Sequence, residues 1–123
     1  MMDEREIFLK LKSLLSSYVP PLVVMVDEDR RYDVYGNKRA KIGKKEHENV
    51  YFASTIIQKH HVGLYFFPIY THRDRFSDQP DSLIKLLKGK SCFHLKKYDE
   101  AIFAEIEALL DKGIDVYREE GWV

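Results

Sequence analysis

Apolar residues recur at three- and four-residue spacing near both ends of the chain, and this is the period of an amphipathic helix. The first stripe predicts a helix over Asp3–Tyr18 with Asp3 as its N-cap. Pro20-Pro21 ends this helix, because proline lacks the backbone donor that a helix needs. The second stripe predicts a helix that begins near Asp99 and that Gly113 ends or kinks.

Between these helices the pattern changes to short runs of β-branched and aromatic residues, which favour strands. The dominant segment is Asn49–Tyr70, two apolar runs joined at Gln58–His61, and it predicts a long antiparallel hairpin. Leu22–Val26, Tyr32–Tyr35 and Ser91–Lys97 are expected as three further strands.

Two connecting segments have weaker patterns. Lys38–Glu48 is the most charged stretch, and we expect either a loop or an extension of the second strand through Ala40 and Ile42. Thr71–Gly89 is expected to contain one or two helical turns.

The two strands of the predicted hairpin do not alternate apolar with polar residues. Period-two geometry groups their side chains as Val50, Phe52, Ser54 and Ile56 against Tyr51, Ala53, Thr55 and Ile57, and as Val62, Leu64 and Phe66 against Gly63, Tyr65 and Phe67. We expect helices to cover one face. The other face is either partly covered or presents an apolar surface to a ligand or a second subunit.

The resulting order is one helix, four strands, a helix, one strand and a final helix. Mostly antiparallel strands with helices on one face define a two-layer α+β domain with a five-stranded sheet. The 123 residues match the length of a single domain, so we assign residues 1–123 to one unit.

Composition narrows the class of protein. Lys plus Arg and Asp plus Glu are both 20, so no overall field attracts nucleic acid or an anionic membrane. The single cysteine, Cys92, excludes an internal disulfide framework and fits a reducing cytoplasmic compartment. No apolar run approaches the roughly 18 residues of a membrane span. We therefore expect a cytoplasmic protein without nucleic-acid or membrane partners.

Aromatic residues gather around the hairpin, and they are the main candidates for ligand binding. Tyr51, Tyr65, Phe67 and Tyr70 lie on or beside it, and His72 follows the end of the fourth strand. They predict a binding module that holds a small ligand or a protein partner on the sheet face or in a cleft at the sheet edge. Homodimerisation through that face is the structural alternative. No nucleophile elbow or glycine-rich phosphate loop occurs, so no enzymatic activity is expected.

Three carboxylates on the last predicted helix are the candidates for a metal site. Glu100, Glu107 and Asp111 share one helix face, at spacings of seven and four residues. Clustered carboxylates hold hard or borderline cations weakly. A solvated helix face is the alternative, because Lys112 is adjacent.

The chain also resembles the YdhG-like domain family of small bacterial proteins. The resemblance rests on Val50–Ile57 and the following QKHHVGLY, on Leu83–Leu87 leading to Gly89–Leu95, and on Gly121-Trp122. It implies a two-layer domain with a five-stranded sheet of the secretion-chaperone type. Some members are described as frataxin-like iron chaperones, so the resemblance also implies weak binding of ferrous iron. The long, proline-free segment Gly36–Glu48 departs from the family, whose members commonly carry a proline after the second strand.

Overall fold

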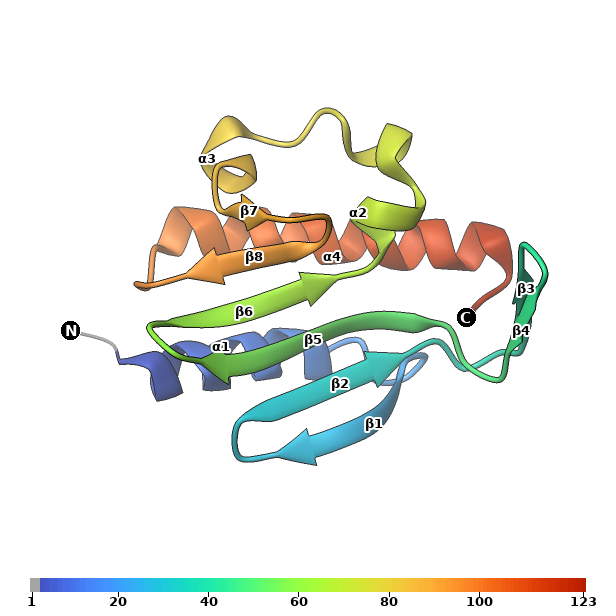
Figure 1. Ribbon diagram of the computed structural model, residues 1–123, viewed down its shortest axis with the longest axis horizontal. Helices are drawn as coiled ribbons and strands as arrows, with labels where there is room; N and C mark the ends of the chain where they lie inside the picture. The colour runs from blue at the N-terminus through green and yellow to red at the C-terminus, as the bar shows by residue number, and fades with distance from the viewer. Residues whose placement is uncertain (1–2) are drawn as a thin grey trace.

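The chain forms an α+β fold in which a six-stranded antiparallel sheet packs against two long helices at the ends of the chain (Figure 1). The computed structural model describes residues 3–123. Its helices are α1 (Glu4–Ser16), α2 (Pro68–Thr71), the 3-10 helix η1 (Arg73–Phe76), α3 (Asp81–Ile84) and α4 (Glu100–Glu120). Its strands are β1 (Val23–Glu28), β2 (Arg31–Tyr35), β3 (Ala40–Ile42), β4 (Lys45–His47), β5 (Tyr51–Gln58), β6 (His61–Phe66), β7 (Leu87–Lys88) and β8 (Cys92–Leu95).

The sheet has the strand order β1-β2-β5-β6-β8-β7, and β3 and β4 form a separate small hairpin. All five strands predicted from the pattern are present, with the β5–β6 hairpin at the centre of the sheet. The predicted count of five is one too few. Strand β7 has only two residues and pairs with Phe93 and Cys92 of β8, so its place depends on tertiary pairing that leaves no sequence pattern. The charged segment Lys38–Glu48 is neither a loop nor an extension of β2, because it forms the β3–β4 hairpin.

The predicted helix starts are confirmed. The Asp3 carboxylate accepts a hydrogen bond from the Glu6 backbone N–H (2.9 Å), and the Asp99 carboxylate caps α4 in the same way. The expectation that Gly113 ends or kinks the last helix is wrong. Helix α4 continues to Glu120 and ends at Gly121, whose φ of 79° is the left-handed conformation typical of a helix C-cap.

Gly113 lies where α4 packs against the centre of the sheet. A Cβ atom there would lie 2.6 Å from Phe66 Cζ and 3.1 Å from Phe52 Cε1. The same two rings meet edge to face at 5.6 Å between centroids, and Phe52 makes a similar contact with Tyr117 of α4 at 5.1 Å. Glycine is therefore required in α4 for close approach to the sheet, not to stop the helix.

A β-bulge shifts the side-chain pattern at the start of β5. Val34 of β2 pairs with Ala53, but the next residue, Tyr35, pairs with Tyr51, so Phe52 is the extra residue. Phe52 is completely buried, and Tyr51 points to the opposite face. The predicted grouping of Phe52 with Ser54 and of Tyr51 with Ala53 is therefore wrong, because simple alternation fails across a bulge.

We expect Gly113→Ala to lower the free energy of unfolding by up to about 2 kcal/mol. Overpacking a core costs about 1–3 kcal/mol, and the roughly 1 kcal/mol by which alanine favours a helix over glycine offsets only part of that cost. Urea denaturation measures the change, and Ala108→Gly on the exposed face of α4 measures the helix-propensity difference without the packing. An increase in stability for Gly113→Ala would contradict this account of the contact.

Candidate functional site

One face of the sheet lies away from α1 and α4, and we call it the open face. No helix in residues 3–123 covers it, as Figure 1 shows with the two long helices behind the sheet. Even so, some of its polar side chains are buried. Ser54 and Asp33 are only 1% and 2% exposed, although both belong to this face. The open face is therefore mixed in polarity rather than a bare apolar surface.

Four aromatic side chains form a row across one end of the open face. Tyr35 contacts Tyr51 at 5.2 Å between ring centroids, Tyr51 contacts Phe67 at 5.6 Å, and Phe67 contacts Tyr70 at 5.8 Å. Three of these residues are sequence candidates that the fold brings together. Tyr35 was not among the predicted ligand residues, because its place beside Tyr51 depends on the pairing of β2 with β5. The fourth aromatic candidate, Tyr65, instead contacts Gln58.

Tyr65 belongs to a polar cluster at the other end of the open face. The Gln58 side-chain amide donates to its hydroxyl at 2.6 Å, and the same amide contacts His61 Nε2 at 2.6 Å through its oxygen. The rings of His61 and His94 stack with 3.8 Å between centroids. Burial raises the pKa of the neighbouring Cys92 thiol, which favours the protonated form over the more reactive thiolate.

An ion pair anchors the middle of the open face. The Arg31 guanidinium donates to both carboxylate oxygens of Asp33 at 3.0 and 3.1 Å, and these hydrogen bonds raise the pKa of Arg31. Beside it the Tyr51 hydroxyl donates to Ser54 Oγ, and burial raises the pKa of Tyr51 above its ordinary value. The buried carboxylate depends on its arginine, since a charge taken out of water needs a partner.

We expect Arg31→Met to lower the free energy of unfolding by about 1–3 kcal/mol, because it leaves the Asp33 carboxylate buried without its charged donor. The matched control is Arg30→Met, since Arg30 makes a single long hydrogen bond of 3.4 Å to the Ile57 carbonyl. The control is expected to change stability by no more than about 0.5 kcal/mol. Equal losses in chemical denaturation of the two variants would refute the role of the ion pair.

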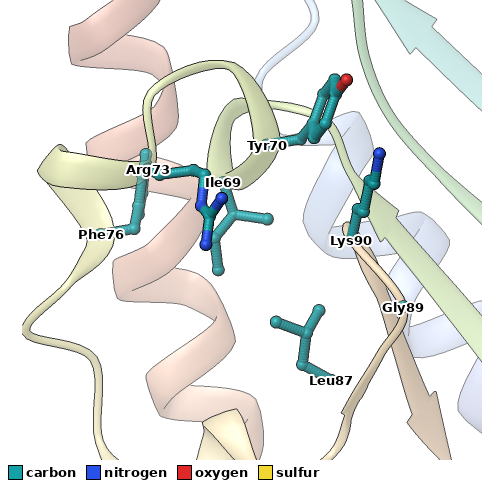
Figure 2. Close-up of a pocket in the computed structure, with 7 residues that line it drawn as sticks. All are labelled: Ile69, Tyr70, Arg73, Phe76, Leu87, Gly89 and Lys90. Atoms are coloured by element: carbon teal, nitrogen blue, oxygen red, sulfur yellow. The ribbon is translucent and has the colours of Figure 1, made fainter.

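The aromatic row ends at Tyr70, which also lines a pocket at the edge of the sheet (Figure 2). This sheet-edge pocket has a volume of about 670 Å³ and lies between the α2–η1 segment and β7. Ile69, Phe76 and Leu87 supply its apolar side chains, of which the first two are buried. The volume lies within the range of about 300–1,000 Å³ that is typical of small-molecule sites.

The charges that line the sheet-edge pocket are all positive. Arg73 and Lys90 lie on opposite sides of it in Figure 2, and no acidic side chain of residues 3–123 lines it. Lys90 Nζ also lies 5.3 Å from the centre of the Tyr70 ring, a cation–π contact. Lys90 directly follows Gly89, whose φ of 72° favours glycine at this turn. An anionic group is therefore favoured in the pocket.

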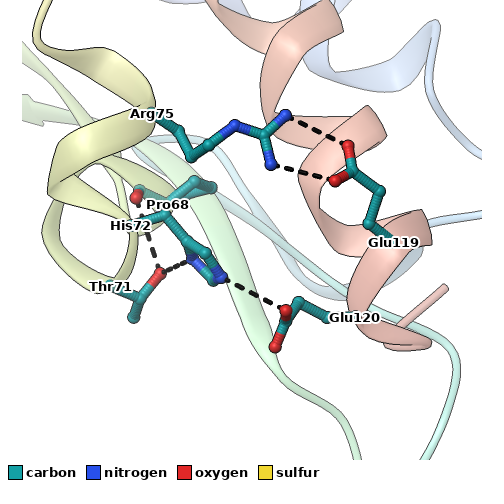
Figure 3. A network of polar contacts seen from close by, with 6 residues as sticks. All are labelled: Pro68, Thr71, His72, Arg75, Glu119 and Glu120. Carbon is teal, nitrogen blue, oxygen red and sulfur yellow. Dashed lines mark hydrogen bonds and ion pairs between the residues drawn. The ribbon is translucent and has the colours of Figure 1, made fainter.

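A polar network fixes the α2–η1 segment to the end of α4 (Figure 3). The Arg75 guanidinium donates to both oxygens of Glu119 at 2.9 and 3.1 Å. His72 Nδ1 contacts Thr71 Oγ1 at 2.8 Å, and its Nε2 lies 3.8 Å from a carboxylate oxygen of Glu120. The predicted ligand residue His72 thus lies against α4 and outside the sheet-edge pocket, where it helps to position the pocket wall.

The three carboxylates predicted to bind iron lie along the outer face of α4. All three are exposed, and the Tyr18 hydroxyl donates to the Asp111 carboxylate and contacts the Glu107 backbone carbonyl at 3.4 Å. Glu100 lies in the first turn of the helix. Within residues 3–123 no three His, Cys, Asp or Glu side chains are grouped so that they hold one metal ion. Iron binding stays a prediction of the resemblance, without a preformed ligand set in this part of the chain.

Comparisons with protein families, with curated proteins and with solved structures find no match for this chain. Membership of the YdhG-like family therefore stays a prediction. Among the helices of residues 3–123, none is both long enough and apolar enough to cross a membrane.

Proposed function

We propose that this protein is a non-enzymatic binding module whose sheet-edge pocket holds a small molecule with one anionic group and an aromatic or aliphatic body. The observation that carries the proposal is the charge pattern of that pocket, in which Arg73 and Lys90 stand over an apolar floor without a lining carboxylate. Apolar walls with a few convergent polar groups are the usual composition of small-molecule sites.

The two cations have different chemical roles in this proposal. The planar guanidinium of Arg73 suits two parallel hydrogen bonds to a carboxylate or sulfonate, whereas the Lys90 ammonium acts as a point charge. Tyr70 is 44% exposed, so its ring is available to an aromatic body. The contacts of Arg75 and His72 with α4 tether the pocket wall without a ligand, which supports a low conformational cost of binding.

We also propose that the protein is related to the YdhG-like family and that its sheet is of the secretion-chaperone type. This kinship is supported by a long helix at each end of the chain and by the β5–β6 hairpin at the centre of the sheet. The proposed ligand class rests on the pocket alone and does not depend on the kinship.

The test is a fluorescence titration with 8-anilinonaphthalene-1-sulfonate, which combines a sulfonate with an aromatic body. We expect Arg73→Gln and Lys90→Gln each to weaken its affinity roughly tenfold, since a hydrogen bond to a charged group contributes about 1.5 kcal/mol. Lys59→Gln is the matched control, because it removes the same charge from the exposed turn between β5 and β6.

The neutral analogue N-phenyl-1-naphthylamine separates charge from apolar contact. It is expected to bind more weakly than the sulfonate and to respond to none of the three substitutions. The proposal fails if Lys59→Gln weakens sulfonate binding as much as Arg73→Gln does, or if neither pocket substitution changes the affinity.

A further inference from the structure

A second pocket, of about 560 Å³, lies where α3, β7, β8 and the first turn of α4 meet. Leu86, Leu95 and Ile102 form its apolar lining. Four lysines surround it, and we call it the lysine pocket. They are Lys85, Lys88, Lys96 and Lys97.

The charge of the lysine pocket is not balanced locally. None of its four lysines has an ion-pair partner among residues 3–123, although basic side chains elsewhere, such as Lys12 and Lys112, pair with carboxylates. The carboxylate that lines the pocket, Asp99, is already used as the N-cap of α4, where it accepts from Ala101 N–H at 2.9 Å and from Ile102 N–H at 3.2 Å. In a chain with 20 basic and 20 acidic residues, this is a local concentration of positive charge.

His94 also lines the pocket. Its pKa is lowered first by burial and then by the nearby charges of His61, Lys88 and Lys96. Its backbone N–H donates to the Leu86 carbonyl at 2.9 Å, which holds β8 against the segment that carries Lys85 and Lys88.

The walls of the pocket are held together by a second contact. Ser82 Oγ of α3 donates to the Glu105 carboxylate of α4, at 2.9 Å to each oxygen. This contact holds α3 against α4, so the pocket lies between two tethered elements and the sheet, and four lysines are among the residues that line it.

We infer that the lysine pocket is a binding site for a phosphomonoester with an aromatic or aliphatic body. A phosphate group carries up to two negative charges and three acceptor oxygens, so it can pair with more ammonium groups than a carboxylate can. The apolar lining can contact the organic body of the ligand. This site is separate from the sheet-edge pocket, which has a single arginine and a single lysine. Either proposal stands if the other fails.

The experiment is a titration with 1-naphthyl phosphate, followed by calorimetry and by the proton NMR signals of the histidine rings. Binding is expected to shift the His94 signal, since His94 lines this pocket. Lys88→Gln combined with Lys96→Gln is expected to weaken the affinity by about tenfold or more, the effect of losing a charged hydrogen-bond partner. The matched control is Lys44→Gln with Lys45→Gln, which removes the same charge from exposed lysines of the β3–β4 hairpin.

Three further controls test which groups are recognised. Inorganic phosphate and 1-naphthol each carry half of the proposed ligand, and both are expected to bind more weakly than 1-naphthyl phosphate. The Arg73→Gln variant is expected to bind 1-naphthyl phosphate with unchanged affinity. The inference is overturned if the control pair loses as much affinity as the pocket pair, if Arg73→Gln abolishes binding, or if no binding occurs at millimolar concentration. It is also overturned if a single-stranded oligothymidylate binds the same lysines more tightly, because the site then serves a nucleic acid.

Discussion

The close contact between α4 and the centre of the sheet is the constraint on which the rest of this structure depends. At Gly113 the helix lies so near the sheet that the rings of Phe52 and Phe66 occupy the space of a side chain. The β-bulge at Phe52 is part of the same arrangement, because it turns this ring toward α4 and Tyr51 toward the open face. The packing of Phe52 against α4 on the covered face of the sheet thus places Tyr51 on the open face.

The position of the sheet-edge pocket follows from this arrangement. Helix α4 runs straight through Gly113, so its last turn reaches the α2–η1 segment and pairs with it through Glu119 and Glu120. That segment carries Arg73 and Tyr70, while the sheet edge carries Lys90 on the turn after β7. The pocket is therefore lined by two separate parts of the chain, residues 69–76 and 87–90, and the last turn of α4 contacts the first of them.

Periodicity in the sequence was sufficient for the elements that bury a continuous apolar face. The two long helices, the residues at which they start and five strands could be predicted because each has a local pattern, whereas the end of α4 at Gly121 was not predicted. Strand β7 and the bulge could not, since a two-residue strand and a one-residue register shift arise from tertiary pairing. The same reason explains the site. Tyr51, Phe67 and Tyr70 lie on or beside one hairpin and were predicted, whereas Arg73 and Lys90 line the same pocket only because the chain folds.

The most direct test of the central claim is NMR mapping of the sheet-edge pocket with isotope-labelled protein and 8-anilinonaphthalene-1-sulfonate. The account predicts that backbone signals of residues 69–76 and 87–90 shift together as the pocket fills. It also predicts that these shifts are lost in Arg73→Gln, while signals of the open-face strands β2 and β5 remain in place. Shifts centred on β2 and β5, or an unchanged spectrum at saturating probe, would contradict the claim that this pocket is the binding site.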